Sequence, residues 1–459
     1  MTDRHADVLA MLSWNKAAPG SVLMRLLKYD DRAIRRTIAQ RGNLSTELVE
    51  AILTDPDPAL RMEFALSENA DPAQRARLLD DPFPRVALAL AVGPTPYRRP
   101  VEPLPDWAYE RLLSHPQERV RRETATSHLV PAHLLAGLVH HPDGTLRQAS
   151  CRAWDRLPEA TRRALLQDDD PDVRRVAALR VCHQDEALTT WLVEHLQDSW
   201  KLSDVLRAGR LSHELAECMA DGPRAAALAA NPFLSPGLVR RLALSPDPRV
   251  RLVVSARPEL AESERAAIDY IVEPDARLDP LEWVWEARDD ADVLRRCATS
   301  AHPWLRRSAA VCPTLPADLV ELLAQDEDFA VRLLLCEFHP EPPPELLLDL
   351  YLNGSHRAVK MLITRPSFPS AGLAARFADS TDPERRSLAL RDPALSPDLL
   401  VRFTHQPDLR RAAARHPRLP VPRIRELLKD PGTAGAAAGN PSLPSGDMHR
   451  LLDDAGVPA

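Results

Sequence analysis

Apolar residues recur along the whole chain at the i, i+3, i+4 spacing that marks one face of an α-helix. Val49, Ile52 and Leu53 show this spacing in one segment, and Val250 and Val253 show it in another. A half-buried strand would instead alternate apolar and polar residues at every second position. The pattern therefore predicts an all-α protein built from short amphipathic helices.

The helical segments belong to one repeat. Three consecutive segments align without gaps, and they start at Asp382, Gln406 and Asp430. A proline keeps its place in repeat after repeat: Pro94, Pro232, Pro258, Pro313, Pro340, Pro366, Pro393, Pro417 and Pro441. The chain accommodates roughly 17 two-helix repeats with a period of about 24–28 residues. Since one repeat cannot bury its apolar face alone, we expect the repeats to stack into an α-solenoid.

In many repeats proline marks the start or the end of the second helix, although the earlier copies lack the later proline. Asp57-Pro58 and Asp247-Pro248 are typical helix starts, because the aspartate accepts a free backbone N–H and proline at the first position loses no bond. A later proline prevents the helix from continuing. The sequence has 44 prolines and only 15 glycines, so proline-bearing turns separate the helices and glycine-rich phosphate loops are not expected.

The repeat predicts one continuous α-solenoid over residues 1–459. The period is disturbed around 95–107, 180–221 and 269–302. The last repeat, 430–459, is rich in alanine and glycine between Gly432 and Gly439, and it is interpreted as a weak C-terminal capping repeat.

The repeat motif resembles a known family. Its best copies are Pro232–Ala256, Pro313–Leu335 and Pro393–Ala414. The motif N/H-P-x-L-P-x-x-L-L, followed by D-P-D-x-x-V-R-x-x-x-A, resembles the leucine-rich repeat variant, a relative of HEAT-type α-solenoids. The resemblance implies a right-handed superhelix of alternating α and short 3₁₀ helices. Some members carry an N-terminal cysteine cluster for an iron–sulfur centre, but no cysteine precedes Cys151 here, so no cofactor is expected. The family has no common activity.

Charge and cysteine content narrow the class of protein further. The net charge is −7, from 59 basic and 66 acidic residues, which gives no global attraction to nucleic acid or anionic membranes. Six cysteines lie far apart without a C-x-x-C pair, as expected for buried thiols in a reducing compartment. The charged start and the absence of an 18-residue apolar run predict a cytoplasmic protein without a membrane partner.

A basic residue recurs in the second helix of most repeats, and an aspartate often precedes it by four residues. Arg251 and Arg332 are two examples, preceded by Asp247 and Asp328. One interpretation is an arginine stripe that binds phosphates or acidic peptides along one face of the solenoid. The other is a structural pair, made with the capping aspartate or laddered to the next repeat. The regular pairing and the negative net charge favour the structural interpretation. The stripe is Arg35, Arg61, Arg121, Arg147, Arg174, Arg251, Arg306, Arg332, Lys360, Arg386 and Arg410.

Departures from the repeat are the best candidates for recognition. The segment Thr95–Trp107 lengthens one interval by about eight residues, as a projecting recognition loop or an inert insertion would. Tryptophans in 269–302 fit either an interface or a divergent core. The candidate partner-binding residues are Tyr97, Arg98, Arg99, Trp107, Trp283, Trp285, Arg306 and Arg332.

Catalytic and metal-binding signatures do not stand out. The sequence contains no G-x-S-x-G, H-E-x-x-H or Walker loop. His128, His133, His140 and His141 fall close together without a cysteine or carboxylate signature, so capping roles at turns are favoured over a metal site.

The sequence therefore predicts a non-enzymatic repeat scaffold that binds a protein or peptide partner on an extended solenoid face. The alternative is a nucleic-acid-binding HEAT-like protein, including a base-processing one, that uses the arginine stripe. A regulatory subunit or scaffold of a larger complex is a further alternative.

Overall fold

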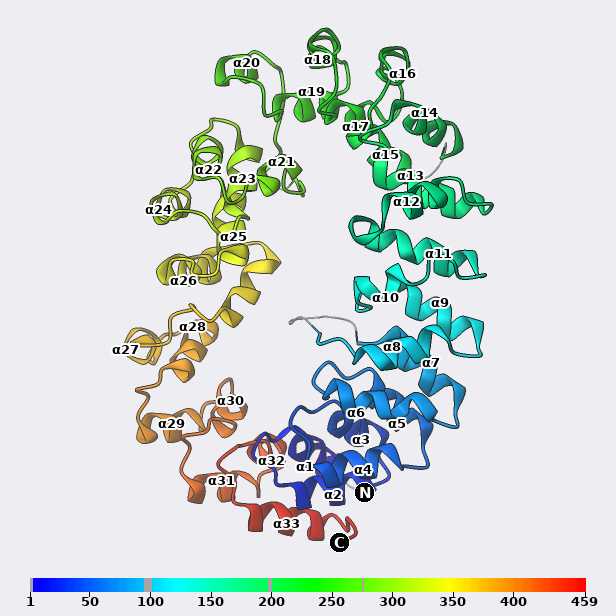
Figure 1. Ribbon diagram of the computed structural model, residues 1–459. Helices are drawn as coiled ribbons and strands as arrows, with labels where there is room; N and C mark the ends of the chain where they lie inside the picture. Colours follow the sequence, from blue (N-terminus) through cyan, green and yellow to red (C-terminus); the bar gives the residue numbers. More distant parts are fainter. Residues whose placement is uncertain (1–2, 95–100, 197–199, 275) are drawn as a thin grey trace. The chain divides into compact units, whose positions relative to one another are not determined.

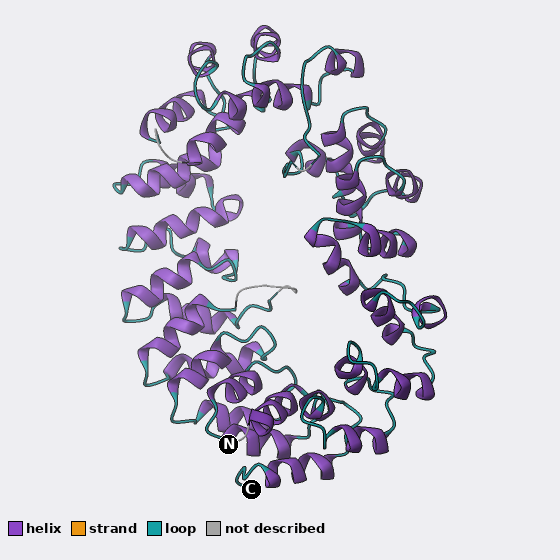
Figure 2. Ribbon diagram, turned by 180° about the vertical axis from the view of Figure 1, so that it is seen from behind, coloured by secondary structure: helices purple, strands orange, loops and turns teal. Residues whose placement is uncertain are grey.

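The computed structural model describes residues 3–94, 101–196, 200–274 and 276–459. Over these residues it contains 33 α-helices and four short 3₁₀ helices, and no strand (Figures 1 and 2). The prediction of an all-α protein is confirmed. No helix of the described part is both long and apolar enough to cross a membrane.

The contacts divide the chain into two compact units, residues 1–177 with 371–459 and residues 178–370. The helices of the first unit are α1 (Asp3–Trp14), α2 (Gly20–Lys28), α3 (Arg32–Ala39), α4 (Thr46–Leu53), α5 (Pro58–Ala65), α6 (Pro72–Ala76), η1 (Arg77–Asp80), α7 (Pro84–Val92), α8 (Asp106–Leu113), α9 (Glu118–Thr126), α10 (Ala132–Ala136), α11 (Gly144–Ser150), η2 (Cys151–Arg156), α12 (Glu159–Leu166), α27 (Leu373–Phe377), α28 (Pro383–Leu388), η4 (Ala389–Arg391), α29 (Pro397–Phe403), α30 (Arg410–Ala414), α31 (Val421–Leu427), α32 (Ala434–Ala438) and α33 (Ser445–Asp454).

Helix α13 (Pro171–Val181) contains the boundary between the units. The helices of the second unit are α14 (Glu186–His195), α15 (Trp200–Ala208), α16 (His213–Met219), α17 (Ala225–Ala229), α18 (Pro236–Ala243), α19 (Pro248–Ser255), α20 (Glu262–Ala266), α21 (Glu282–Glu286), α22 (Ala291–Ala298), α23 (Pro303–Ala310), α24 (Ala317–Ala324), α25 (Phe329–Phe338), α26 (Pro344–Asn353) and η3 (Arg357–Thr364).

Each repeat pairs a first helix with a second helix, and the second helices stack on one another. In the first unit α3 packs on α5, α5 on α7 and α7 on α9. These second helices begin at Arg32, Pro58, Pro84 and Glu118. The longer last interval contains the insertion at 95–107. Stacking of neighbouring repeats is the architecture of an α-solenoid.

Local sequence explains where the helices start. In the second helices, the Asp57 carboxylate accepts a hydrogen bond from the Ala59 N–H, with Pro58 at the first helical position. Many first helices follow serine or proline, and in α4 and α18 the fourth residue after the cap, Val49 or Val239, is buried. The predicted caps are therefore confirmed at these helices, and the i, i+3, i+4 stripe forms the core.

The disturbed region 269–302 is held by donors from α23. No helix lies between α20 and α21 in the described residues. The Trp304 indole N–H donates to the Asp279 carbonyl at 2.9 Å. The buried Arg307 guanidinium donates to the carbonyls of Glu273 and Pro274 at 3.4 and 3.2 Å. Side chains of α23 therefore bind several carbonyls of the irregular segment, where no regular helix pair is present among the described residues.

Candidate partner-binding site

The arginine stripe forms a hydrogen-bonded ladder between repeats. The Arg306 side chain is largely buried, and its guanidinium donates to the carbonyls of Ser300 and Ala301 at 3.0 and 3.1 Å. The same guanidinium donates to both carboxylate oxygens of Asp326 in the next repeat, at 2.7 and 3.2 Å. One arginine thus closes the turn before its own helix and binds the turn of the following repeat.

This arrangement recurs along the chain. Arg147 donates to the His141 carbonyl and to both carboxylate oxygens of Asp168, all at 2.8 Å. The Arg147 guanidinium holds the pKa of the Asp168 carboxyl below its ordinary value, although burial opposes the shift. Other arginine–aspartate rungs between repeats join Arg35 to Asp55, Arg61 to Asp81, Arg251 to Asp269 and Arg386 to Asp408. The stripe is therefore a ladder at these positions, and its charge is directed into the fold.

The candidate residues predicted from the sequence lie in different surroundings. The Arg332 guanidinium donates to the carbonyls of Asp326 and Glu327 in the turn before its helix, so it is held like the other stripe arginines. The Trp283 indole donates to the Ala256 carbonyl at 3.1 Å, and the half-buried ring packs against a core cluster. Trp283 is therefore part of the divergent core.

The other tryptophan candidates are exposed. Trp107 is 48% exposed at the start of α8 in the first unit. Trp285 is 43% exposed in the second unit, with the Arg288 guanidinium 5.3 Å from its ring centroid. Tyr97, Arg98 and Arg99 lie outside the described residues. Two of the candidate tryptophans are therefore exposed, one in each unit.

Histidines at the turns act as caps. The Nδ1 atoms of His115, His141 and His356 accept hydrogen bonds from the backbone N–H two residues later. His133 instead pairs with Asp106 at 2.7 Å. No group of three or more histidine, cysteine or acidic side chains that could hold a metal occurs among the described residues.

A buried serine–histidine pair lies in the second unit. The Ser255 hydroxyl and His302 Nε2 are 2.8 Å apart, and neither residue is exposed. Tyr270 stacks on the imidazole with ring centroids 4.2 Å apart. Burial, with the nearby Arg265 charge, lowers the pKa of His302 to about 4. Because His302 Nδ1 accepts the Trp304 N–H and the residue is neutral at pH 7, the pair acts as a buried structural contact.

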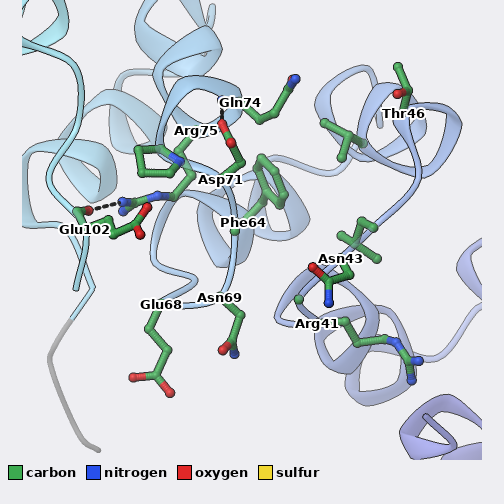
Figure 3. A pocket seen from close by; sticks show the side chains of 15 residues that line it. Arg41, Asn43, Thr46, Phe64, Glu68, Asn69, Asp71, Gln74, Arg75 and Glu102 are labelled. Atoms are coloured by element: carbon green, nitrogen blue, oxygen red, sulfur yellow. Dashed lines mark hydrogen bonds between the residues drawn. The ribbon is translucent and has the colours of Figure 1, made fainter. Parts of the chain in front are cut away.

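A cavity of about 650 Å³ lies at the turns before α4 and α6 (Figure 3). Amide and carboxylate side chains from both turns surround it, and the buried Phe64 is among its lining residues. Asn43, at one side, is the one described non-glycine residue with a left-handed backbone, with φ of 55°. We call this cavity the turn pocket. It is lined by Arg41, Gly42, Asn43, Leu44, Thr46, Val49, Phe64, Glu68, Asn69, Ala70, Asp71, Pro72, Gln74, Arg75 and Glu102.

Arg75 connects the turn pocket to the insertion. It is 2% exposed, its Nη2 donates to the Glu102 carbonyl at 3.0 Å, and its Nε has no hydrogen-bond partner among the described residues. Burial lowers the pKa of Arg75. Two residues further on, the Leu104 N–H donates to the Tyr109 hydroxyl at 3.2 Å. Arg75 and Tyr109 therefore fix the described end of the insertion against the core, beside the pocket.

Sequence reasoning missed Arg75, although a signal was present. The fourth residue after the first-helix cap is Val49, Val239 or Leu400 in regular repeats, and all three are buried. The same position holds Arg75 in α6 and Arg265 in α20. Both arginines precede disturbed repeats, so an arginine at a core position marks where a loop replaces regular stacking.

The turn pocket is a recess of mixed polarity between two neighbouring repeats, and its volume lies within the range of small-ligand pockets. Comparisons of the chain with protein-family models and with curated protein sequences found no match.

Proposed function

We propose that the protein is a non-enzymatic repeat scaffold that binds a peptide segment of a partner protein, with the turn pocket as a contact site. The observation that carries this proposal is the position of the pocket beside an insertion that is anchored by Arg75. The resemblance to the leucine-rich repeat variant and a cytoplasmic location belong to the same proposal.

The lining supports a peptide as the ligand. Glu68 and Glu102 are exposed, and Asn43 and Asn69 supply amide donors and acceptors from two consecutive turns. A peptide backbone offers donors and acceptors that match these polar side chains.

Selection from a displayed random peptide library on the full chain tests this function. We expect enriched peptides to bind Glu68→Arg about tenfold more weakly than the unmodified protein, because the substitution reverses a charge at the pocket. Glu47→Arg is the matched control, since Glu47 is an exposed acid of α4 that does not line the pocket. Equal losses for the two variants, or no enriched peptide, would contradict the proposal.

The nucleic-acid alternative loses support from the ladder, because Arg306 and Arg61 bind carboxylates within the fold. We therefore expect mobility-shift titrations with single- and double-stranded DNA and RNA at physiological salt to show at most weak, non-specific retention. Tight binding that falls steeply with added salt would instead establish the alternative.

A further inference from the structure

The first and last repeats of the chain pack together within the first unit. Helix α32 lies against α1, and α33 contacts both α1 and α2 (Figure 1). The second helices therefore continue from α30 through α32 to α1 and then α3. Residues 434–438, interpreted from the sequence as part of a weak cap, are all buried.

We call the contact between the first and last repeats the junction. The turn contacts across the junction match those between repeats that follow one another in the chain. Asn440 Nδ2 donates to the carbonyls of Ala414 and His416 at 2.7 and 2.9 Å. Asn15 Nδ2 donates to the carbonyls of Ala438 and Asn440 at 2.9 and 2.8 Å. In each case the acceptors are the turn residue of the preceding repeat and the residue two positions before it. Asn15 thus occupies the place of the repeat that would follow Asn440.

The same contact continues into the chain from the first repeat. The Arg41 guanidinium donates to the carbonyls of Ser13 and Asn15 at 2.7 and 3.1 Å. The series Asn440, Asn15, Arg41 is therefore uninterrupted, although Asn15 and Asn440 are 425 residues apart in sequence. Asn15 and Asn440 are fully buried, so their amides need these partners.

Charged and small side chains of the first and last repeats are also complementary at the junction. Arg25 donates to the Asp453 carboxylate at 2.7 Å and to the carbonyls of Val457 and Pro458 at 2.6 and 2.9 Å. A Cβ atom on Gly435 would lie 2.0 Å from Asp7 Oδ2, so a larger residue here would displace the Asp7 carboxylate of α1. The alanine- and glycine-rich composition of α32 thus has a packing function.

We infer that the face of the last repeat, 430–459, is a docking surface for the first repeat, 1–28, of the same chain. The two end repeats form one more repeat-to-repeat interface, and it is joined by non-covalent contacts alone. An intramolecular partner is favoured over a second copy, because both ends belong to one unit and are present at high effective concentration.

Hydrogen exchange on the full chain tests this inference. We expect the amides of α1 to be protected like those of α3, independently of protein concentration, in a monomer. Gly435→Ala will raise α1 exchange rates about tenfold, since the added methyl group displaces Asp7. Asp7→Ala combined with Gly435→Ala will restore protection by removing the clash.

Gly446→Ala in α33 is the matched control, because its Cβ would meet no atom within 4 Å, and it will leave α1 exchange unchanged. Three results would overturn the inference: unprotected α1 amides in the unmodified protein, Gly435→Ala without effect on α1, or protection that requires a dimer. The last result would assign the docking surface to a second copy of the chain. Should Gly435→Ala fail to fold, recovery in the double variant supports the inference, and persistent failure contradicts it.

Discussion

Arg306→Ala will lower the free energy of unfolding by about 3 kcal/mol, because it leaves the Asp326 carboxylate charged and buried without its partner. It also removes the donor to the carbonyls of Ser300 and Ala301. Urea denaturation of the full chain, followed by circular dichroism, measures the change.

Arg295→Ala is the matched control for this prediction. Arg295 also pairs with an aspartate of the next repeat, Asp318, at 2.6 Å, but both side chains are more than half exposed. We expect its unfolding curve to overlay that of the unmodified protein, because solvent screens an exposed ion pair. Equal destabilisation by the two variants would show that burial does not determine how much these arginine–aspartate salt bridges contribute to stability.

Acidification will weaken the second unit through His302. The pKa of His302 is about 4 in the folded protein, against an ordinary value of 6.5. Between these pH values the unfolded chain binds a proton that the folded chain does not, so stability is complete above about pH 6.5 and falls as the pH drops toward 4. The difference corresponds to about 3 kcal/mol.

His302→Asn tests this pH dependence, since asparagine keeps an acceptor for the Trp304 N–H and does not titrate. We expect the unfolding free energy of the variant to change less between pH 7 and pH 4 than that of the unmodified protein. Identical pH profiles would show that His302 is not the responsible group.

Regular features of the fold follow directly from the sequence. The apolar spacing around Val49 and the Asp57-Pro58 step are local signals, and the structure has the helices and caps that they predict. The ladder was predicted as one of two arrangements for the aspartates four residues before the arginines. Arg61 forms its salt bridge with Asp81 of the next repeat, whereas Asp57, four residues before Arg61, caps the helix that contains Arg61.

The turn pocket and the junction depend on tertiary contacts that no local spacing encodes. Arg75 breaks the pattern of core residues, but only the fold shows that its partner is the carbonyl of Glu102 in the insertion. Gly435 belongs to a composition that is typical of a weak end repeat, and its contact with Asp7 arises because the first and last repeats meet.

A double-mutant cycle on Arg61 and Asp81 tests most directly the central claim that the recurrent arginines join successive repeats. Both side chains are at least nine-tenths buried, and the Asp81 carboxylate raises the pKa of Arg61. The unfolding free energies of Arg61→Ala, Asp81→Ala and the double variant should give a coupling energy of about 2 kcal/mol. Additive effects of the two substitutions in folded proteins would contradict the claim.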